Sequence, residues 1–133
     1  MNWRIGYNRN MDIEWFKNKA EGKISLYPYH ILVNVSLKPY LENVDFVRVG
    51  VTKDDKLIIQ PVKPQDEERV LAEGEVLLPL SHKKTADRFG NAAICRHILQ
   101  RLDFKEGDCP IKMKCVYEEE IGLIAEKEEG GYR

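Results

Sequence analysis

The histidines and cysteines are the residues of this chain best suited to nucleophilic or metal chemistry. Their spacing matches neither a nucleophile motif nor a metal-binding motif. No two cysteines form a CxxC pair, and the Cys95-Arg96-His97 step has no second ligand pair at zinc-site spacing. No histidine has a serine or cysteine partner in a nucleophile motif, and no glycine-rich phosphate loop is present. We therefore predict no catalytic residue, no metal site, no cofactor and no enzymatic activity. The residues concerned are His30, His82, His97, Cys95, Cys109 and Cys115.

The cysteine usage also indicates a compartment. Three cysteines are an odd number, whereas a small secreted domain held by disulfides normally carries an even and denser set. Cys95 belongs to an apolar stripe with Ile94, Ile98 and Leu102, so we expect it to be a small buried hydrophobe. This pattern favours the reducing cytoplasm.

The charged residues are balanced in number but unevenly distributed. The chain carries 21 Lys and Arg against 22 Asp and Glu, for a formal net charge of −1, which excludes a generic polycation for nucleic acid or membranes. Residues 1–61 carry +2, residues 62–81 carry −3, residues 82–115 carry +4 and residues 116–133 carry −4, which sum to −1. A phosphate-binding face is therefore expected within residues 82–115, unless the blocks neutralise one another in the fold.

The elements that position these charges fit one small domain. A chain of 133 residues, 43% hydrophobic and 32% charged, can fold as a globular unit without disulfides. No apolar run approaches the ~20 residues of a membrane span. The N-terminus lacks the apolar core of a signal peptide. We expect no membrane partner.

The first half of the chain predicts strands, a short helix and a hairpin. Alternating and β-branched residues predict the strands, and Ser36 can cap the helix. The turn Thr52-Lys53-Asp54-Asp55 separates the last two strands and predicts a hairpin. The expected strands are 23–26, 31–35, 45–51 and 56–60, and the expected helix is 37–42.

The second half repeats this order at an offset of about sixty residues. Asn91 can cap a helix in which Ile94, Ile98 and Leu102 form a core stripe. Residues 111–117 alternate apolar with basic side chains, as a half-buried strand does. Because one half cannot bury its apolar faces alone, the two halves, or two chains, must interlock. The expected helix is 92–102 and the expected strands are 86–89, 111–117 and 121–125.

A leader, an acidic linker and a short tail accompany the two halves. In the leader Asp12 can cap a helix to about Ala20, and we expect Trp15 and Phe16 to pack on the body or to contact a partner. Pro79 in the linker is typical of an edge strand. The boundaries are 1–22 for the leader, 23–61 for the first half, 62–81 for the linker and edge strand, 82–126 for the second half and 127–133 for the tail.

The repeat resembles a known family. Residues 101–108, Arg-Leu-Asp-Phe-Lys-Glu-Gly-Asp, are similar to the leu-gly-leu-lys-glu-gly-asp turn of AbrB/MraZ-type (SpoVT/AbrB-like) swapped-hairpin transcription regulators. Residues 22–26, Gly-Lys-Ile-Ser-Leu, are similar to their gly-arg-ile-x-ile start. Two copies in one chain resemble the MraZ arrangement, and the sequence also looks similar to two-half proteins of bacterial mobile elements. The resemblance covers about residues 23–126.

The resemblance implies a fold and a function. The expected fold is mostly β with short helices (α+β), in which two strand–helix–hairpin halves form a pseudo-twofold swapped-hairpin β-barrel. The expected function is a DNA-binding transcription regulator without catalysis, with double-stranded DNA and a second copy of the chain as partners. The chain departs from the family at the ile-pro step of the helix entrance, where Val33-Asn34 and Gly90-Asn91 stand instead. The arginine that contacts DNA after that step is also missing from the first half.

Basic residues near the helix entrances are the candidate DNA contacts that this resemblance implies. Arg96 and Arg101 lie on the polar face of the expected second helix, where a solvated surface is the alternative interpretation. Such side chains position phosphate, and none here obviously reads bases. The candidates are Lys83, Lys84, Arg88, Arg96 and Arg101, with Lys23 and Lys38 as counterparts in the first half.

A second class of function is a non-enzymatic protein-interaction or accessory module of a bacterial mobile element. The aromatic leader and the hairpin edges could each pair with a partner. The acidic runs at residues 66–68 and 118–120 could do the same, although such runs are usually solvated turns. The sequence leaves both classes open, together with the DNA sequence preference, the protein partner and the oligomeric state.

Overall fold

The computed structural model describes residues 12–14 and 21–128. Residues 12–14 carry no regular secondary structure. The rest of the helix expected up to Ala20, and the expected packing of Trp15 and Phe16, lie outside the described residues.

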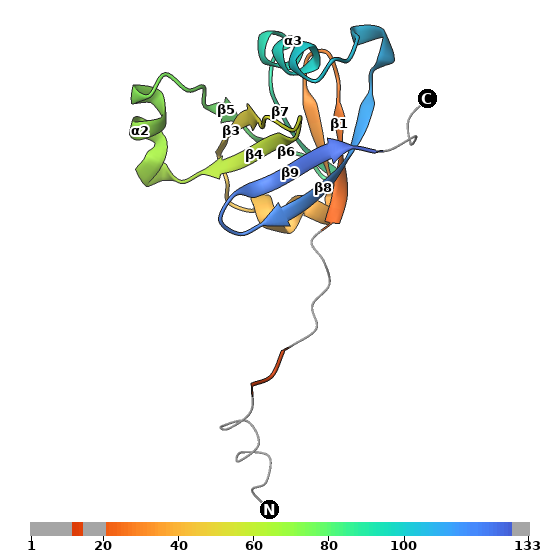
Figure 1. Ribbon diagram of the computed structural model, residues 1–133. Helices are drawn as coiled ribbons and strands as arrows, with labels where there is room; N and C mark the ends of the chain where they lie inside the picture. The colour runs from red at the N-terminus through yellow and green to blue at the C-terminus, as the bar shows by residue number, and fades with distance from the viewer. Residues whose placement is uncertain (1–11, 15–20, 129–133) are drawn as a thin grey trace, which may run out of the picture.

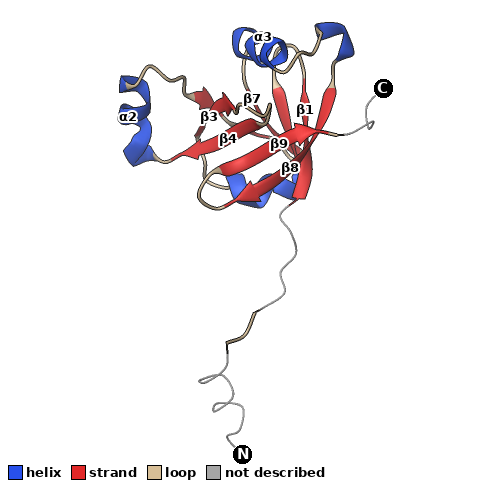
Figure 2. Cartoon of the chain, viewed as in Figure 1, coloured by secondary structure: helices blue, strands red, loops and turns tan. Residues whose placement is uncertain are grey.

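Nine short strands form the body of the described chain. They are β1 (Glu21–Leu26), β2 (Ile31–Asn34), β3 (Phe46–Val51), β4 (Leu57–Val62), β5 (Leu78–Pro79), β6 (Ser81–His82), β7 (Ala86–Phe89), β8 (Ile111–Glu118) and β9 (Gly122–Lys127). All pairs are antiparallel, in the order β5-β3-β4-β9-β8-β1-β2-β7-β6. The two edge strands, β5 and β6, are consecutive in the chain with only Leu80 between them, so the sheet curls into a nearly closed barrel (Figure 2).

Short helices lie around this barrel: η1 (Val35–Leu41), η2 (Pro64–Asp66), α2 (Glu67–Ala72), α3 (Ala92–Arg101) and η3 (Glu106–Asp108). Figure 1 shows α3 at one end of the barrel and η1, in yellow-orange, at the opposite end. Helix α2 stands to one side, beyond the ends of β3 and β4. The expectation of a mostly β fold with short helices is confirmed.

Helix α3 forms as its sequence predicts. The Asn91 Oδ1 accepts a hydrogen bond from the Ile94 backbone N–H at 2.9 Å, which caps the first turn. Cys95 and Ile98 are buried against the barrel, on the expected apolar stripe. The helix ends before Asp103, whose φ of 62° is a left-handed conformation.

The first-half helix differs from the prediction at its start. Asn34, rather than Ser36, is the capping residue, because its Oδ1 accepts from the Ser36 backbone N–H at 2.9 Å. The helix therefore begins at Val35 and is a 3-10 helix. Its close approach to β1 requires glycine at position 22, where a Cβ would lie 2.5 Å from the Ser36 Oγ and 2.7 Å from the Leu37 Cγ.

The linker is more ordered than its composition predicts. Residues 62–75 complete β4 and form η2 and α2, because Val70 supplies a buried anchor that is only 1% exposed. Arg69 adds ion pairs with Asp66 and Glu73 at i,i+3 and i,i+4 spacing. The expected edge strand over 76–80 is shorter, at Leu78–Pro79, and pairs with β3. Leu80 then donates its backbone N–H to the Asp45 carbonyl at 2.9 Å.

Both predicted hairpins are confirmed, and their inward side chains fill the barrel. In the first hairpin Asp55 takes a φ of 62° in the turn between β3 and β4. In β8, buried residues alternate with exposed lysines, so one face of the strand is core and the other is surface. The largest fully buried side chains are Ile24, Leu26, Ile31, Leu37, Leu41, Leu57, Ile59, Leu78, Leu99, Leu102, Ile111 and Met113.

Within the described part of the chain, no helix has the length and apolar character needed to cross a membrane.

Candidate nucleic-acid interface

One outer surface of the barrel collects basic and hydrogen-bonding side chains. It is formed by the neighbouring strands β8, β1, β2 and β7. Because side chains alternate across a strand, residues between the core positions point outward. One row across the strands is Lys112–Ser25–Leu32–Arg88, in the paired register. We call this surface the basic face; its members are Lys23, Ser25, Leu32, Asn34, Ala86, Arg88, Lys112 and Lys114.

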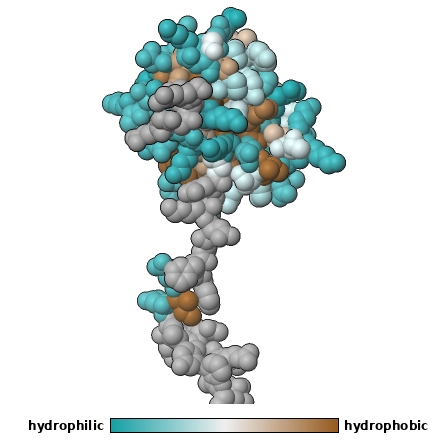
Figure 3. Space-filling model, turned by 90° about the vertical axis from the view of Figure 1, so that its right-hand side faces the viewer, coloured by the Kyte–Doolittle hydropathy of each residue, from teal (hydrophilic) through white to brown (hydrophobic). Residues whose placement is uncertain are grey.

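Three cations of the basic face have no acidic partner among the residues that the structure describes. Among the described residues no carboxylate oxygen lies within 4.0 Å of the charged groups of Arg88, Lys112 or Lys114, and all three side chains are exposed. Lys23, opposite Lys114 in the β1–β8 pair, differs because its Nζ lies 2.9 Å from the Glu128 Oε1. Figure 3 turns the side of the barrel with β1 and β8 toward the viewer, and hydrophilic residues cover most of it. The basic face is therefore a local positive surface on a chain of net charge −1.

Two turns border the basic face at opposite ends of the strands. The turn between β6 and β7 exposes Lys83 and Lys84, neither of which has an ion pair within the part of the chain that the structure describes. The turn between β1 and β2 is aromatic, with the His30 ring 4.6 Å from that of Tyr27 and 4.9 Å from that of Tyr29 between centroids. Burial, and then the nearby Arg88 guanidinium, lower the pKa of His30 below its usual range. At neutral pH His30 is therefore uncharged, and the β1–β2 turn contributes aromatic rings to the border of the basic face.

Two candidate residues from the sequence lie apart from the basic face. Arg96 and Arg101 belong to α3, which lies at the end of the barrel (Figure 1). Both are exposed, and both have acidic partners. The Arg96 Nε lies 3.2 Å from the Glu106 Oε1, and the Arg101 Nη1 lies 2.9 Å from the Asp55 Oδ1. The structure thus brings Lys83, Lys84, Arg88 and Lys23 near one surface and leaves this arginine pair elsewhere.

Lys38 is turned toward a buried carboxylate instead of solvent. Its Nζ donates to the Asp87 Oδ1 at 2.9 Å and to the Lys83 carbonyl at 2.8 Å. Asp87 is 0% exposed and is the buried charged residue of the described core. Through these two hydrogen bonds Lys38 connects η1 to β7 and to the β6–β7 turn.

His82 completes this cluster. Its Nδ1 lies 3.0 Å from the Asp87 Oδ1, and its Nε2 lies 2.8 Å from the Val44 carbonyl oxygen. Both ring nitrogens of His82 thus face oxygen atoms, one of a carboxylate and one of a backbone carbonyl. The Asp87 Oδ2 has no hydrogen-bond partner among the described residues. Through these contacts the cluster joins η1, β7 and the segments around Val44 and His82.

Lys112 and Lys114 are members of the basic face that the sequence did not single out. Their alternation with Ile111, Met113 and Cys115 is visible in the sequence and marks them as outward-facing. What the sequence lacks is the pairing of β8 with β1, which places Lys112 opposite Ser25 and Lys114 opposite Lys23. The alternation in the sequence shows that both lysines face outward. Their place on the basic face depends on the pairing of β8 with β1, which are distant in the chain.

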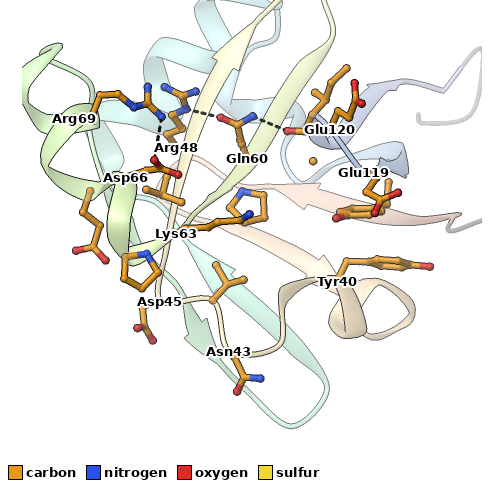
Figure 4. A pocket seen from close by; sticks show the side chains of 18 residues that line it. Tyr40, Asn43, Asp45, Arg48, Gln60, Lys63, Asp66, Arg69, Glu119 and Glu120 are labelled. Atoms are coloured by element: carbon orange, nitrogen blue, oxygen red, sulfur yellow. Dashed lines mark hydrogen bonds and ion pairs between the residues drawn. The ribbon is translucent and has the colours of Figure 1, made fainter.

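A second surface feature is an acidic cavity of about 570 Å³ beside α2. Asp66 and Glu67 from one acidic run line it together with Glu119 and Glu120 from the other (Figure 4). Glu119 and Glu120 lie in the exposed turn between β8 and β9, as expected of an acidic run, and the fold brings this turn to the same cavity as Asp66 and Glu67. Asp45, from the segment that precedes β3, also lines the cavity.

Aromatic and amide groups form the wall between the acidic residues. The rings of Tyr40 and Tyr117 stack with centroids 4.3 Å apart. The Arg48 Nε donates to the Gln60 Oε1 at 2.7 Å, and the Gln60 Nε2 donates to the Ile121 carbonyl at 3.0 Å (Figure 4). Arg48 is further paired with Glu75, so its charge is neutralised within the protein.

The cysteines are free thiols within the fold. Burial raises the pKa of Cys95 to about 11 and that of Cys115 to about 12. The pKa of Cys109 is also raised, by burial and then by Asp108 and Glu106. These thiols are therefore protonated at neutral pH. Across residues 12–14 and 21–128, no group of three or more His, Cys, Asp or Glu is arranged to hold a metal ion.

A scan against protein-family models and searches of curated proteins and of solved structures give no match to this chain. The function proposed below therefore depends on the residues and their geometry.

Proposed function

We propose that this protein is a non-catalytic transcription regulator that binds double-stranded DNA through the basic face. The observation that carries this proposal is the set of exposed cations on that face, Arg88, Lys112 and Lys114, which have no carboxylate within 4.0 Å among the described residues. Unpaired surface cations release counterions from DNA when they meet phosphates, which is the main source of sequence-independent affinity.

The dimensions of the face suit a duplex. Lys112 and Arg88 are separated by three strand spacings, or about 14 Å between backbones. That span is close to the ~12 Å width of the major groove, so the two side chains can reach phosphates on opposite sides of it. Lys83 and Lys84 extend the positive surface beyond β7. The basic face supplies phosphate contacts, and base readout would have to come from the bordering turns.

We further propose that the barrel is a pseudo-twofold swapped-hairpin fold. The first half supplies β1, β2, η1 and the hairpin β3–β4, and the second supplies β7, α3 and the hairpin β8–β9, preceded by β5 and β6. The second hairpin pairs through β8 with β1, and the first pairs through β3 with β5, the edge strand that ends the linker. The pairs β2–β7 and β4–β9 join corresponding strands. These pairings support the proposal and its likeness to the AbrB/MraZ type.

The same pairings bear on assembly and location. Because the hairpins of both halves find partners within one chain, a single chain can complete the barrel, and a homodimer would have to use another surface. Three free cysteines agree with the reducing cytoplasm that we propose as the location.

Fluorescence anisotropy with a labelled random-sequence duplex tests DNA binding. We expect a dissociation constant of roughly 10⁻⁶–10⁻⁴ M at physiological salt, and tighter binding at low salt. With three phosphate contacts, from Arg88, Lys112 and Lys114, the plot of log K against log salt should have a slope of about −3. Absence of binding at tens of micromolar protein in low salt, or a slope near zero, would contradict the proposal.

The acidic cavity favours a second candidate function, a protein-interaction module. Its uncommitted carboxylates, including those of Glu67, Glu119 and Glu120, are complementary to a basic peptide. The stacked tyrosines offer ring faces to an ammonium or guanidinium group. We expect a Lys- and Arg-rich peptide to bind in calorimetry and Glu119→Lys/Glu120→Lys to weaken it at least ten-fold. Equal binding by a Gln-substituted peptide would rule out this function for the cavity.

A further inference from the structure

A small groove lies within the basic face and contains no acidic residue. Its volume is about 170 Å³, and it crosses β8, β1, β2 and the start of β7. This space equals roughly five or six waters at about 30 Å³ each. It is below the ~300 Å³ at which sites for whole small molecules begin, so it suits one compact polar group. The lining residues are Lys23, Ser25, Leu32, Asn34, Thr85, Ala86 and Lys112.

The polar groups of the groove are mostly free hydrogen-bond donors. The hydroxyls of Ser25 and Thr85 have no side-chain hydrogen bond to any described residue. The Asn34 Oδ1 already accepts from the Ser36 backbone N–H, which leaves the two N–H donors of its amide uncommitted within the described part of the chain. The ammonium of Lys112 is exposed and has no carboxylate partner in the same part of the chain.

We propose that this groove binds one phosphate group of the DNA backbone. A phosphodiester has only acceptor oxygens, which match the hydroxyl, amide and ammonium donors around the groove. Most of these donors are uncharged, so the groove fixes the register of the duplex on the face rather than adding to its total charge. This inference rests on the proposed DNA-binding function and assigns one phosphate contact within it.

Removing an uncharged hydrogen-bond donor and removing a cation have different effects on the salt dependence of duplex binding. We expect Ser25→Ala and Thr85→Val each to weaken duplex binding about ten-fold, the effect of losing a hydrogen bond to a charged group. The slope of log K against log salt should stay unchanged, because no charge is removed. Lys112→Ala should instead reduce the magnitude of that slope by about 1. A matched pair of charge variants adds a second test: Ser25→Asp, which places a carboxylate in the groove, should weaken duplex binding, whereas Gln100→Glu, which adds the same charge at an exposed position of α3, should not.

Inorganic phosphate, added at matched ionic strength, tests whether the groove binds a phosphate of the DNA backbone or a free phosphate compound. The backbone assignment is supported if the Ser25 and Thr85 variants weaken duplex binding at an unchanged slope, Gln100→Glu does not, and phosphate leaves the Ser25 and Thr85 amide signals unmoved. It is overturned, with DNA binding intact, if both variants bind the duplex as tightly as the wild type while Lys112→Ala does not. If the wild type fails to bind the duplex but phosphate saturates those amide signals, the proposed function fails and the groove serves a free phosphate compound. Urea unfolding of each variant confirms that it is folded.

Discussion

Replacing Lys38 with methionine is expected to lower the free energy of unfolding by about 3–5 kcal/mol. The Lys38 side chain is 26% exposed, whereas its partner Asp87 is 0% exposed. Removing the ammonium therefore leaves a buried carboxylate whose remaining side-chain contact is the His82 ring and whose second oxygen is already unsatisfied among the described residues. Urea unfolding followed by circular dichroism measures the loss. The expected loss of about 3–5 kcal/mol is a large share of the ~5–15 kcal/mol free energy of unfolding of a typical domain.

Two further variants separate the ion pair from general effects of the substitution. Lys53→Met, in the exposed β3–β4 turn, is the matched control and should change stability by less than about 0.5 kcal/mol. The double variant Lys38→Met/Asp87→Asn should recover part of the loss, because it also removes the buried charge. A Lys38→Met protein as stable as the Lys53→Met control would show that the buried pair does not hold η1 to β7.

Reversing two charges on the basic face is expected to weaken DNA binding by at least about 60-fold at 0.1 M salt. This factor follows from counterion release. Each lost phosphate contact lowers log K by about 0.9 over one decade of salt, so the loss of two contacts lowers the binding constant about 10^1.8-fold. The variant is Arg88→Glu/Lys112→Glu, and its new carboxylates also repel phosphate. Anisotropy across a salt series should show the magnitude of the slope falling by about 2.

The control for this variant must carry the same net charge. Lys53→Glu/Lys63→Glu changes the charge by 2 × (−2) = −4, as the basic-face variant does, taking the protein from −1 to −5. Lys53 and Lys63 flank β4, which is remote from β2 and β7 in the order of the sheet. A loss of affinity as large in the control as in the basic-face variant would mean that overall charge, rather than this surface, governs binding.

The sequence predicted those elements whose signals are local. Asn91 capped α3 as expected, because a cap needs only the side chain and the amide three residues ahead. The alternation in residues 111–117 marked β8, because the period of a strand is two. The prediction at Ser36 was wrong by two residues, since Asn34 could reach the same turn first. The composition of residues 62–75 did not indicate η2 and α2, because their anchor in the core is a single buried side chain, Val70.

The candidate site could be predicted only in part. Arg88, Lys83 and Lys84 were named from the sequence and do lie on or beside the basic face, whereas Lys112 and Lys114 were not named. Their membership depends on β8 pairing with β1, two segments about 85 residues apart, and register between such segments is set by packing of the core.

Caps, turns and periodicities act within a few residues, so the sequence was enough to predict a small, mostly β chain with short helices and two hairpins. Only the three-dimensional fold shows where the charges lie. It placed Arg88 and Lys112 on one face and turned Lys38 inward to Asp87. It also brought two acidic runs to one cavity. The physical reason is that long-range strand pairing, which local sequence does not encode, fixes which outward side chains become neighbours.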